Sequence, residues 1–229
     1  MRSETAILVF GNSSVQEARQ KNFAPGLGQG ASVRIAEYLI RHTLTTARAT
    51  GLDVLPHFHT QQVGDTFGER LAHAFARAFG LGYRRVMVIG TDSPDLQVAH
   101  LLEAEEELRH GQLVFGPAMD GGVYLIGASQ EHFRQEVFAG LPWKAEGVQA
   151  DMQAYAVEVT AEQHWLGPLE DLDDAQDVRR FVAQGHSGLA QEIRRLLKSP
   201  VLSHKPVVFW LPQQHAAWAH GLRAPPMAA

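Results

Sequence analysis

The sequence predicts an α/β fold with a mostly parallel central sheet. Short apolar segments rich in β-branched residues alternate along the chain with longer segments whose apolar residues repeat with the helical period. Apolar runs without polar alternation are typical of strands buried on both faces, and strand–helix alternation is typical of βαβ units. With 229 residues, of which 45% are hydrophobic, the chain can bury a substantial core.

The first half of the chain shows this alternation most clearly. Residues 5–10, T-A-I-L-V-F, are predicted to form a buried strand, and residues 11–30, rich in Gly, Asn, Ser and Gln, a long loop. Loops of this length at the end of a buried strand are often functional. The predicted elements that follow are a helix over 32–50, a strand over 53–59, a helix over 67–80, a strand over 85–90 and a helix over 98–110.

The second half of the chain is less regular. The predicted elements are strands over 113–115 and 122–126, a helix over 131–138, a strand over 155–159, helices over 174–184 and 189–197, and a strand over 206–211. Glycines at 185 and 188 interrupt the helical pattern. We therefore expect a main domain over residues 1–185 and a helix-and-strand appendage over residues 186–229.

Composition narrows the possible functions. The net charge of −5 predicts no broad basic surface, so nucleic acid is not an expected partner. The absence of cysteine excludes disulfides, thiolate catalysis, zinc fingers and Fe–S clusters. The N-terminus carries no apolar signal core, and no run approaches the roughly 18 apolar residues of a membrane span. We therefore expect a cytoplasmic protein.

The strand predicted over residues 85–90 leads into the most informative segment, G-T-D-S-P-D-L, which carries Asp92 and Asp95. In open α/β sheets, ligands bind beyond the carboxyl ends of the strands. Carboxylates at such a position can hold Mg²⁺ or Mn²⁺, and the cation can in turn hold phosphates. The alternative is structural, with Asp92 or Ser93 capping the next helix and Pro94 in its first turn.

Two acidic segments occur later in the chain. In G-P-A-M-D-G-G-V-Y the glycines let a ligand approach the backbone closely, so Asp120 can contact a sugar or a metal. The alternative there is a hairpin turn. In L-E-D-L-D-D-A-Q-D, Asp171 and Asp173 alternate along an extended chain and can point the same way. The alternative for this segment is capping of the following helix by Asp173 or Asp174.

A fourth candidate segment, Q-V-G-D-T-F-G-E-R, spans residues 62–70 and runs from a loop into a helix. The free N–H groups at a helix start, with Arg70 one turn further on, can form an anion site. The alternative is a capping box, in which Thr66 caps the helix and Glu69 completes the box.

Taken together, these segments resemble a known family. G-T-D-S-P-D-L, G-P-A-M-D-G-G-V-Y-L-I-G and D-L-D-D-A-Q-D-V, in this order and spacing, are similar to a bacterial family of predicted transferases with the glycosyltransferase-A fold, known as DUF2064. Q-V-G-D-T-F-G-E-R-L and A-P-G-L-G resemble the same family, and the similarity covers residues 5–182. The family is related to nucleotidyltransferases that act on molybdopterin and phospholactate.

The resemblance implies a Rossmann-like three-layer sandwich of the nucleotide-diphospho-sugar transferase type. It implies that Asp92 is catalytic and coordinates Mg²⁺ or Mn²⁺ against a nucleotide diphosphate, with Asp171 or Asp173 as a further ligand. Asp120, the other expected catalytic residue, is placed on the acceptor or sugar side. The residues expected to bind the nucleotide or substrate are Gly11, Asn12, Lys21, Gln62, Gly64, Arg70, Gly121 and Gly122.

The loop after the first strand departs from the family. Relatives usually carry an Arg, a Pro-x-Pro-Gly turn and a Lys-Thr-Arg-Leu run there, which supply donors to the nucleotide. In an ungapped comparison this chain has N for the Arg, Q-E for the Pro-Gly and Q-K-N-F for the Lys-Thr-Arg-Leu. Arg19 and Lys21 are the cations that remain, and W-K-A, with Lys144, replaces a Trp-Ser-Thr segment.

Three functional hypotheses follow. The first is a metal-dependent glycosyl- or nucleotidyltransferase that uses a nucleotide or nucleotide sugar and a small-molecule acceptor, with a homodimer as a possible assembly. The second, a catalytically degenerate relative that serves as a binding or regulatory module, is favoured by the depleted cations. The third is an enzyme with an uncharged donor. If Arg19, Lys21, Arg70 and Lys144 all point away from Asp92, the second hypothesis is favoured.

Overall fold

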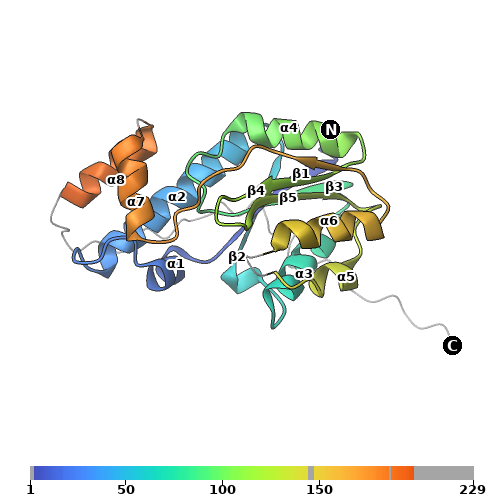
Figure 1. Cartoon of the computed structure of the whole chain (residues 1–229), viewed down its shortest axis with the longest axis horizontal. Coiled ribbons are helices and arrows are strands. Elements are labelled where there is room, and N and C mark those ends of the chain that lie inside the picture. Colours follow the sequence, from blue (N-terminus) through green and yellow to red (C-terminus); the bar gives the residue numbers. More distant parts are fainter. Residues whose placement is uncertain (1–2, 144–146, 186, 199–229) are drawn as a thin grey trace.

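The computed structural model of this chain describes residues 3–143, 147–185 and 187–198 (Figure 1). Six strands form a single sheet with the order β2-β1-β3-β5-β4-β6. The strands are β1 (Thr5–Gly11), β2 (Asp53–Phe58), β3 (Arg85–Ile89), β4 (Leu113–Pro117), β5 (Val123–Ser129) and β6 (Gln163–Trp165).

Five of the six strands run in the same direction. β1 pairs in parallel with β2 and β3, and β4 pairs in parallel with β6, whereas β5 lies antiparallel between β3 and β4. The predicted mostly parallel sheet is therefore confirmed. Because β2 and β3 lie on opposite sides of β1, the strand order reverses at β1, and the carboxyl ends of β1 and β3 meet at this reversal.

Helices cover both faces of the sheet (Figure 1). One hydrophobic cluster joins α3, α5 and α6 to one face, and a second joins α2 and α4 to the other face. The α-helices are α1 (Ser14–Lys21), α2 (Gln29–Ala49), α3 (Phe67–Gly80), α4 (Val98–Arg109), α5 (Gln135–Ala139), α6 (Val148–Glu158), α7 (Ala175–Gln184) and α8 (Gly188–Lys198), and a 3₁₀ helix, η1, spans His59–Gln61. This arrangement is the predicted three-layer sandwich.

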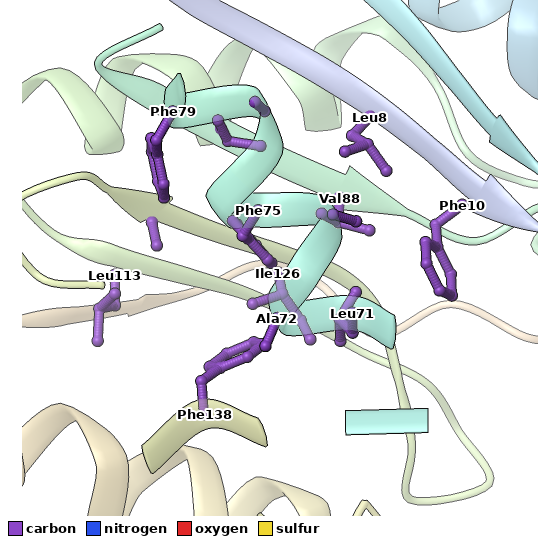
Figure 2. Close-up of a cluster of buried hydrophobic side chains, with 14 of the residues drawn as sticks. Leu8, Phe10, Leu71, Ala72, Phe75, Phe79, Val88, Leu113, Ile126 and Phe138 are labelled. Carbon is purple, nitrogen blue, oxygen red and sulfur yellow. The ribbon is translucent and has the colours of Figure 1, made fainter. Parts of the chain in front are cut away.

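Helix α3 shows how the sequence produces this packing. Its apolar residues recur at helical spacing, so that Leu71, Phe75 and Phe79 lie on one side of the helix. Figure 2 shows these side chains against Val88 and Ile126 of the sheet. All five residues are buried, and burying one such side chain contributes roughly 1.5–3 kcal/mol.

A third cluster, here called the lateral cluster, lies where α2 extends beyond the sheet (Figure 1). It joins α2 to the end of the first loop, to α7 and to α8. Its buried members are Phe23, Ala24, Ala31, Ile35, Ala36, Leu39, Leu172, Val178, Phe181, Val182, Leu189, Ala190, Ile193 and Leu196. The described part of the predicted appendage thus packs on the main domain, and the boundary after residue 185 stays a prediction.

Two predicted elements differ from the structure. The loop predicted over residues 11–30 contains α1, which begins with a capping box formed by Ser13 and Gln16. The strand predicted over residues 155–159 is the end of α6, because Met152 and Tyr155 point into the core at helical spacing. Its alternating letters, Y-A-V-E-V, are those of a strand, but the residues before them continue the helical pattern.

Two further strands remain to be compared with the prediction. The short edge strand β6 was not predicted, since its residues are mostly polar and only partly buried. The strand predicted over residues 206–211 lies outside the described residues. None of the described helices is both long and apolar enough to cross a membrane.

Gly68 is required for the contact between α3 and the segment after α5. A Cβ at this position would lie 2.3 Å from the Ala139 carbonyl oxygen and 2.5 Å from the Trp143 indole nitrogen. We therefore expect Gly68→Ala to lower the free energy of unfolding by about 1–3 kcal/mol through overpacking, measured by urea denaturation.

Gly80→Ala is the matched control, because it lies in the same helix and a Cβ there meets no atom within 4 Å. We expect this change to be neutral or to stabilise the protein by up to about 1 kcal/mol, since alanine is the better helix former. Equal effects of the two substitutions would contradict the packing argument.

Candidate functional site

A cavity of about 330 Å³ lies at the carboxyl ends of β1 and β3. The two strand ends approach closely, because a Cβ on Gly11 would lie 3.1 Å from the Thr91 hydroxyl oxygen. The turn between β4 and β5 and the extended segment before α7 complete its walls. The cavity is therefore built by elements from most of the chain, at the point where the order of the strands reverses.

One wall of the cavity is acidic. Its carboxylates come from the first helix, from the loop after β3, from the β4–β5 turn and from the segment before α7. They are Glu17, Asp92, Asp120, Asp171 and Asp173. Arg70 is the cationic side chain among the described lining residues. The four predicted acids come from three segments that sequence reasoning singled out separately, and the structure brings them together.

Another wall of the cavity is aromatic. The rings of Phe10 and Phe67 meet edge to face at 5.9 Å between centroids, and those of Phe67 and Trp143 meet in the same way at 5.6 Å. All three residues line the cavity. Phe67 is 45% exposed although it is apolar. An exposed ring beside a cavity can stack on a planar ligand group.

Lys21, the last residue of α1, carries the most strongly paired cation of the site. Its Nζ lies 2.6 Å from Asp92 Oδ2 and 2.8 Å from Asp173 Oδ1, and it donates a third hydrogen bond, of 3.2 Å, to the Leu172 carbonyl oxygen. The Lys21 side chain is only 15% exposed. Burial alone would lower the pKa of Lys21, but the two carboxylates outweigh it and raise the pKa above its ordinary value.

Asp171 lies beside this group. Its side chain accepts a hydrogen bond from the Ser93 hydroxyl. Burial, together with the charge of Asp92, raises the pKa of Asp171 to about 7. The backbone N–H of Leu172 donates to the Asp92 carbonyl oxygen at 2.9 Å. The segment before α7 is therefore attached to the loop after β3 by both backbone and side-chain contacts.

The alternatives raised for the two aspartate segments are now distinguished. Capping of the helix after β3 by Asp92 or Ser93 is wrong, because α4 begins at Val98 with Gln97 as its N-cap. Helix α7 is capped by Asp174, whose side chain accepts from the two backbone amides of Gln176 and Asp177. Asp171 and Asp173 are therefore not used as caps and face the cavity.

The Asp120 segment forms a turn and also lines the cavity. One carboxylate oxygen of Asp120 accepts from the Gly122 amide at 2.8 Å, and the Ala118 amide donates to the Gly122 carbonyl oxygen at 2.9 Å. Gly121 has a φ of 97°, in the left-handed region that favours glycine. The hairpin alternative therefore holds, and it leaves the exposed Asp120 at the rim of the cavity.

The predicted anion site at the start of α3 is occupied by its own side chains. Thr66 accepts from the Glu69 amide, and Glu69 accepts from the amides of Asp65 and Thr66, which is the predicted capping box. Arg70 donates to the Asp65 carbonyl oxygen at 3.1 Å and also lines the cavity. Gly64 has a φ of 132°, and a Cβ there would lie 2.6 Å from Glu69.

Most of the predicted site residues line the cavity. The predicted residues that do so are Gly11, Asn12, Gln62, Arg70, Asp92, Asp120, Gly122, Asp171 and Asp173. The Gln62 amide donates to the Gly11 carbonyl oxygen at 2.8 Å, and the Asn12 amide donates to Glu17 at 2.9 Å. Gly64 and Gly121 shape adjoining turns, while Arg19 is exposed and Lys144 lies outside the described residues.

Sequence reasoning missed the aromatic wall and Glu17. The signal for Phe67 was an apolar residue at the start of a helix, outside the helix's buried stripe. Trp143 gave no comparable signal, since its place depends on the packing of α5 against α3. Glu17 lies in α1, which was itself predicted as loop.

Comparison with known proteins agrees with this architecture. A family described as an uncharacterized protein conserved in bacteria, DUF2064, matches residues 35–145. The family resemblance predicted from the sequence is thus confirmed. A comparison with curated proteins gives no match.

Solved structures extend the comparison to the fold. A candidate nucleotide-diphospho-sugar transferase from Desulfovibrio desulfuricans G20 has 23% identity and a TM-score of 0.73, over 88% of this chain and 100% of that chain. Rv0371c from Mycobacterium tuberculosis H37Rv has 16% identity and a TM-score of 0.44, over 79% of this chain and 97% of its own. A CMP:2-keto-3-deoxy-manno-octonic acid synthetase in complex with CTP has 9% identity and a TM-score of 0.46, over 80% and 99%. The first match confirms the predicted nucleotide-diphospho-sugar transferase fold.

His57, which stacks on Phe10 behind the cavity, makes stability depend on pH. Burial, with the charges of Arg77 and His73, lowers the pKa of His57 to about 4 from 6.5. The unfolded chain therefore binds a proton below pH 6.5 that the folded chain does not, so stability falls as pH drops from 6.5 to 4. The loss amounts to as much as about 3 kcal/mol.

We expect His57→Leu to reduce this pH dependence, measured as the difference in urea midpoint between pH 7 and pH 4.5. The leucine keeps an apolar contact with Phe10 but has no proton to gain. If wild type and variant lose the same stability over this range, His57 is not the group responsible.

Proposed function

We propose that this protein is a transferase that acts on a nucleotide-activated substrate, as a glycosyl- or nucleotidyltransferase with a small-molecule acceptor. One observation carries the proposal: an acid-walled cavity lies where the strand order reverses, at the carboxyl ends of β1 and β3. Open α/β sheets bind nucleotides at this position. The cavity volume of about 330 Å³ is in the range of small-molecule sites.

The two walls suggest separate roles for their residues. The rings of Phe67 and Trp143 offer a face on which a nucleobase or sugar ring can stack. The amides of Gln62 and Asn12 lie at the end of β1, where they can hydrogen-bond to polar ligand atoms. Arg70 provides a positive charge at the cavity. We assign the donor nucleotide to this side.

Asp120 is assigned to the acceptor. It is exposed at the rim, and its Oδ1 alone is used by the Gly122 amide, so Oδ2 can accept from an acceptor hydroxyl. A carboxylate in such a position can remove the hydroxyl proton as the oxygen attacks the donor phosphorus or anomeric carbon. Attack at the anomeric carbon releases the nucleoside phosphate, and attack at the phosphorus releases pyrophosphate. In both cases the leaving group takes the electron pair of the broken bond.

The carboxylates of the acidic wall are of the right chemical type to bind the predicted Mg²⁺ or Mn²⁺, but they are not arranged to do so. Carboxylate oxygens are suitable ligands for hard cations. However, the Lys21 ammonium already lies between Asp92 and Asp173, and Asp171 is engaged by Ser93. No group of three acidic or histidine side chains in the described part of the chain is arranged to hold a metal ion. The metal therefore has no step in the proposed reaction.

A second candidate function is a binding or regulatory module without catalysis. It is favoured by the hydrogen bonds of Lys21, whose three N–H donors are all taken by protein oxygens. It is opposed by the position of Lys21. The cations of such a module were expected to point away from Asp92, whereas the Lys21 ammonium contacts Asp92. The two functions differ in whether a bound donor is consumed when an acceptor is supplied.

The donor assignment predicts that nucleoside diphosphates or nucleotide sugars bind and that Phe67→Ala weakens this binding. Loss of one stacked ring corresponds to about 1–3 kcal/mol, or about 5- to 150-fold in Kd. The measurement is a thermal-shift panel of nucleotides followed by calorimetry on the best ligand. Leu102→Ala is the matched control, since Leu102 is 44% exposed and lies on α4, away from the lining residues. A wild type that responds to no nucleotide in the panel would sink the proposal.

The acceptor assignment predicts that Asp120→Asn lowers the transfer rate by roughly 10²–10⁴-fold while the donor Kd changes little. Donor turnover is measured in the presence of an acceptor panel, and the turn is expected to persist because asparagine can accept from the Gly122 amide. Unchanged turnover would remove Asp120 from the reaction. Tight donor binding without turnover in the wild type would favour the binding module.

A further inference from the structure

Lys21 occupies the position that a cation would take between Asp92 and Asp173. Its Nζ is in contact with one oxygen of each carboxylate, at 2.6 and 2.8 Å, and with the Leu172 carbonyl oxygen at 3.2 Å. Two carboxylates and a backbone carbonyl are oxygen donors of the kind that a hard divalent ion accepts. In this chain the same oxygens surround an ammonium that the protein itself supplies.

The position of Lys21 is fixed by its helix. Lys21 ends α1, and the left-handed Asn22, with a φ of 41°, turns the chain so that Phe23 and Ala24 enter the lateral cluster. Ala18, one turn before, is buried as well. The Lys21 side chain is 15% exposed, so the ammonium is held on both sides, by packing at its base and by carboxylates at its tip.

A divalent ion could reach this pair only by displacing the ammonium. Two cations cannot share the carboxylate pair, because like charges at a few ångströms repel strongly in a partly buried site. Displacement would also take Lys21 away from its two nearest carboxylates and leave it the longer contact with Glu17, at 3.9 Å, which is costly for a buried charged group. A metal from solution must therefore compete with a cation that is tethered and already desolvated.

We propose that Lys21 is a built-in cation that takes the place of a divalent metal at the Asp92–Asp173 pair and excludes metal from it. The inference rests on the proposed function, because that function supplies the nucleotide as the ligand. The positive charge that faces a donor phosphate then belongs to the protein and does not arrive with the nucleotide. The side chain of Asp173 is 50% exposed and that of Asp92 is 33% exposed. A phosphate oxygen can therefore replace Asp173 more easily as a hydrogen-bond partner of Lys21.

The test measures Mn²⁺ binding directly, by electron paramagnetic resonance of the free ion, in the full chain without nucleotide. Wild type is expected to show no site tighter than millimolar. Lys21→Ala opens the pair and is expected to bind Mn²⁺ at least about tenfold more tightly than wild type. Adding Asp92→Asn to Lys21→Ala removes one of the two carboxylate ligands and should abolish the gain.

Arg19→Ala is the matched control, because Arg19 is a cation of the same helix but is exposed. It removes the same formal charge and is expected to leave Mn²⁺ binding as in wild type. A gain in Arg19→Ala equal to that of Lys21→Ala would mean that net charge, and not the place of Lys21, controls the ion, and would overturn the proposal.

Two other results would overturn it: a wild type that binds Mn²⁺ as tightly as Lys21→Ala, or a folded Lys21→Ala that gains no binding. If Lys21→Ala does not fold alone, Lys21→Gln, which keeps amide donors near the carboxylates, replaces it. If either variant folds when Mn²⁺ is added but stays unfolded in EDTA without the metal, the proposal is supported. If neither variant folds with Mn²⁺, the result counts against the proposal. The nucleotide panel on wild type in EDTA tests the proposed function separately, since its result does not depend on Mn²⁺ binding by the variants.

Discussion

The structure depends on the burial of β1 on both of its faces and along both of its edges. Helices cover the two faces, and β2 and β3 pair with the two edges, so nearly the whole strand is apolar. Polar groups inside this strand would be desolvated without partners. Polar side chains therefore occur at its two ends: Thr5 begins the strand, and Asn12 follows its carboxyl end, where the chain leaves the sheet and the strand order reverses. The acidic cavity is the direct result, because β3 ends beside β1.

The sequence was most informative where periodicity was strong and packing simple. The bounds predicted for α3 are those observed, since its buried stripe and its Thr66–Glu69 capping box agree. Helix α1 was missed because it is short and polar, with Ala18 as its buried residue. The end of α6 was misassigned because residues 155–159, its last four residues and its C-cap, alternate like a strand. In both cases tertiary contacts decide a conformation that local pattern leaves ambiguous.

The same distinction applies to the cavity. The aspartates could be predicted as candidates because each follows a strand or precedes a helix, where a carboxylate either binds a ligand or stabilises a turn or a helix start. The partner of Asp92 could not, because 71 residues separate it from Lys21 and nothing in the intervening pattern sets the end of α1 against β3. The rings of Phe67 and Trp143 likewise meet only through the packing of α3 with the segment after α5.

Leu172 connects the cavity to the lateral cluster. Its side chain is buried in the lateral cluster, while its backbone N–H and carbonyl oxygen bind Asp92 and Lys21. Since side chains alternate along an extended segment, burying Leu172 on one side directs Asp171 and Asp173 to the other. The register of two charges is thus set by an apolar anchor among α2, α7 and α8. Substitutions in those helices, far from any ligand, can therefore alter the electrostatic field of the cavity by rotating a single segment of backbone.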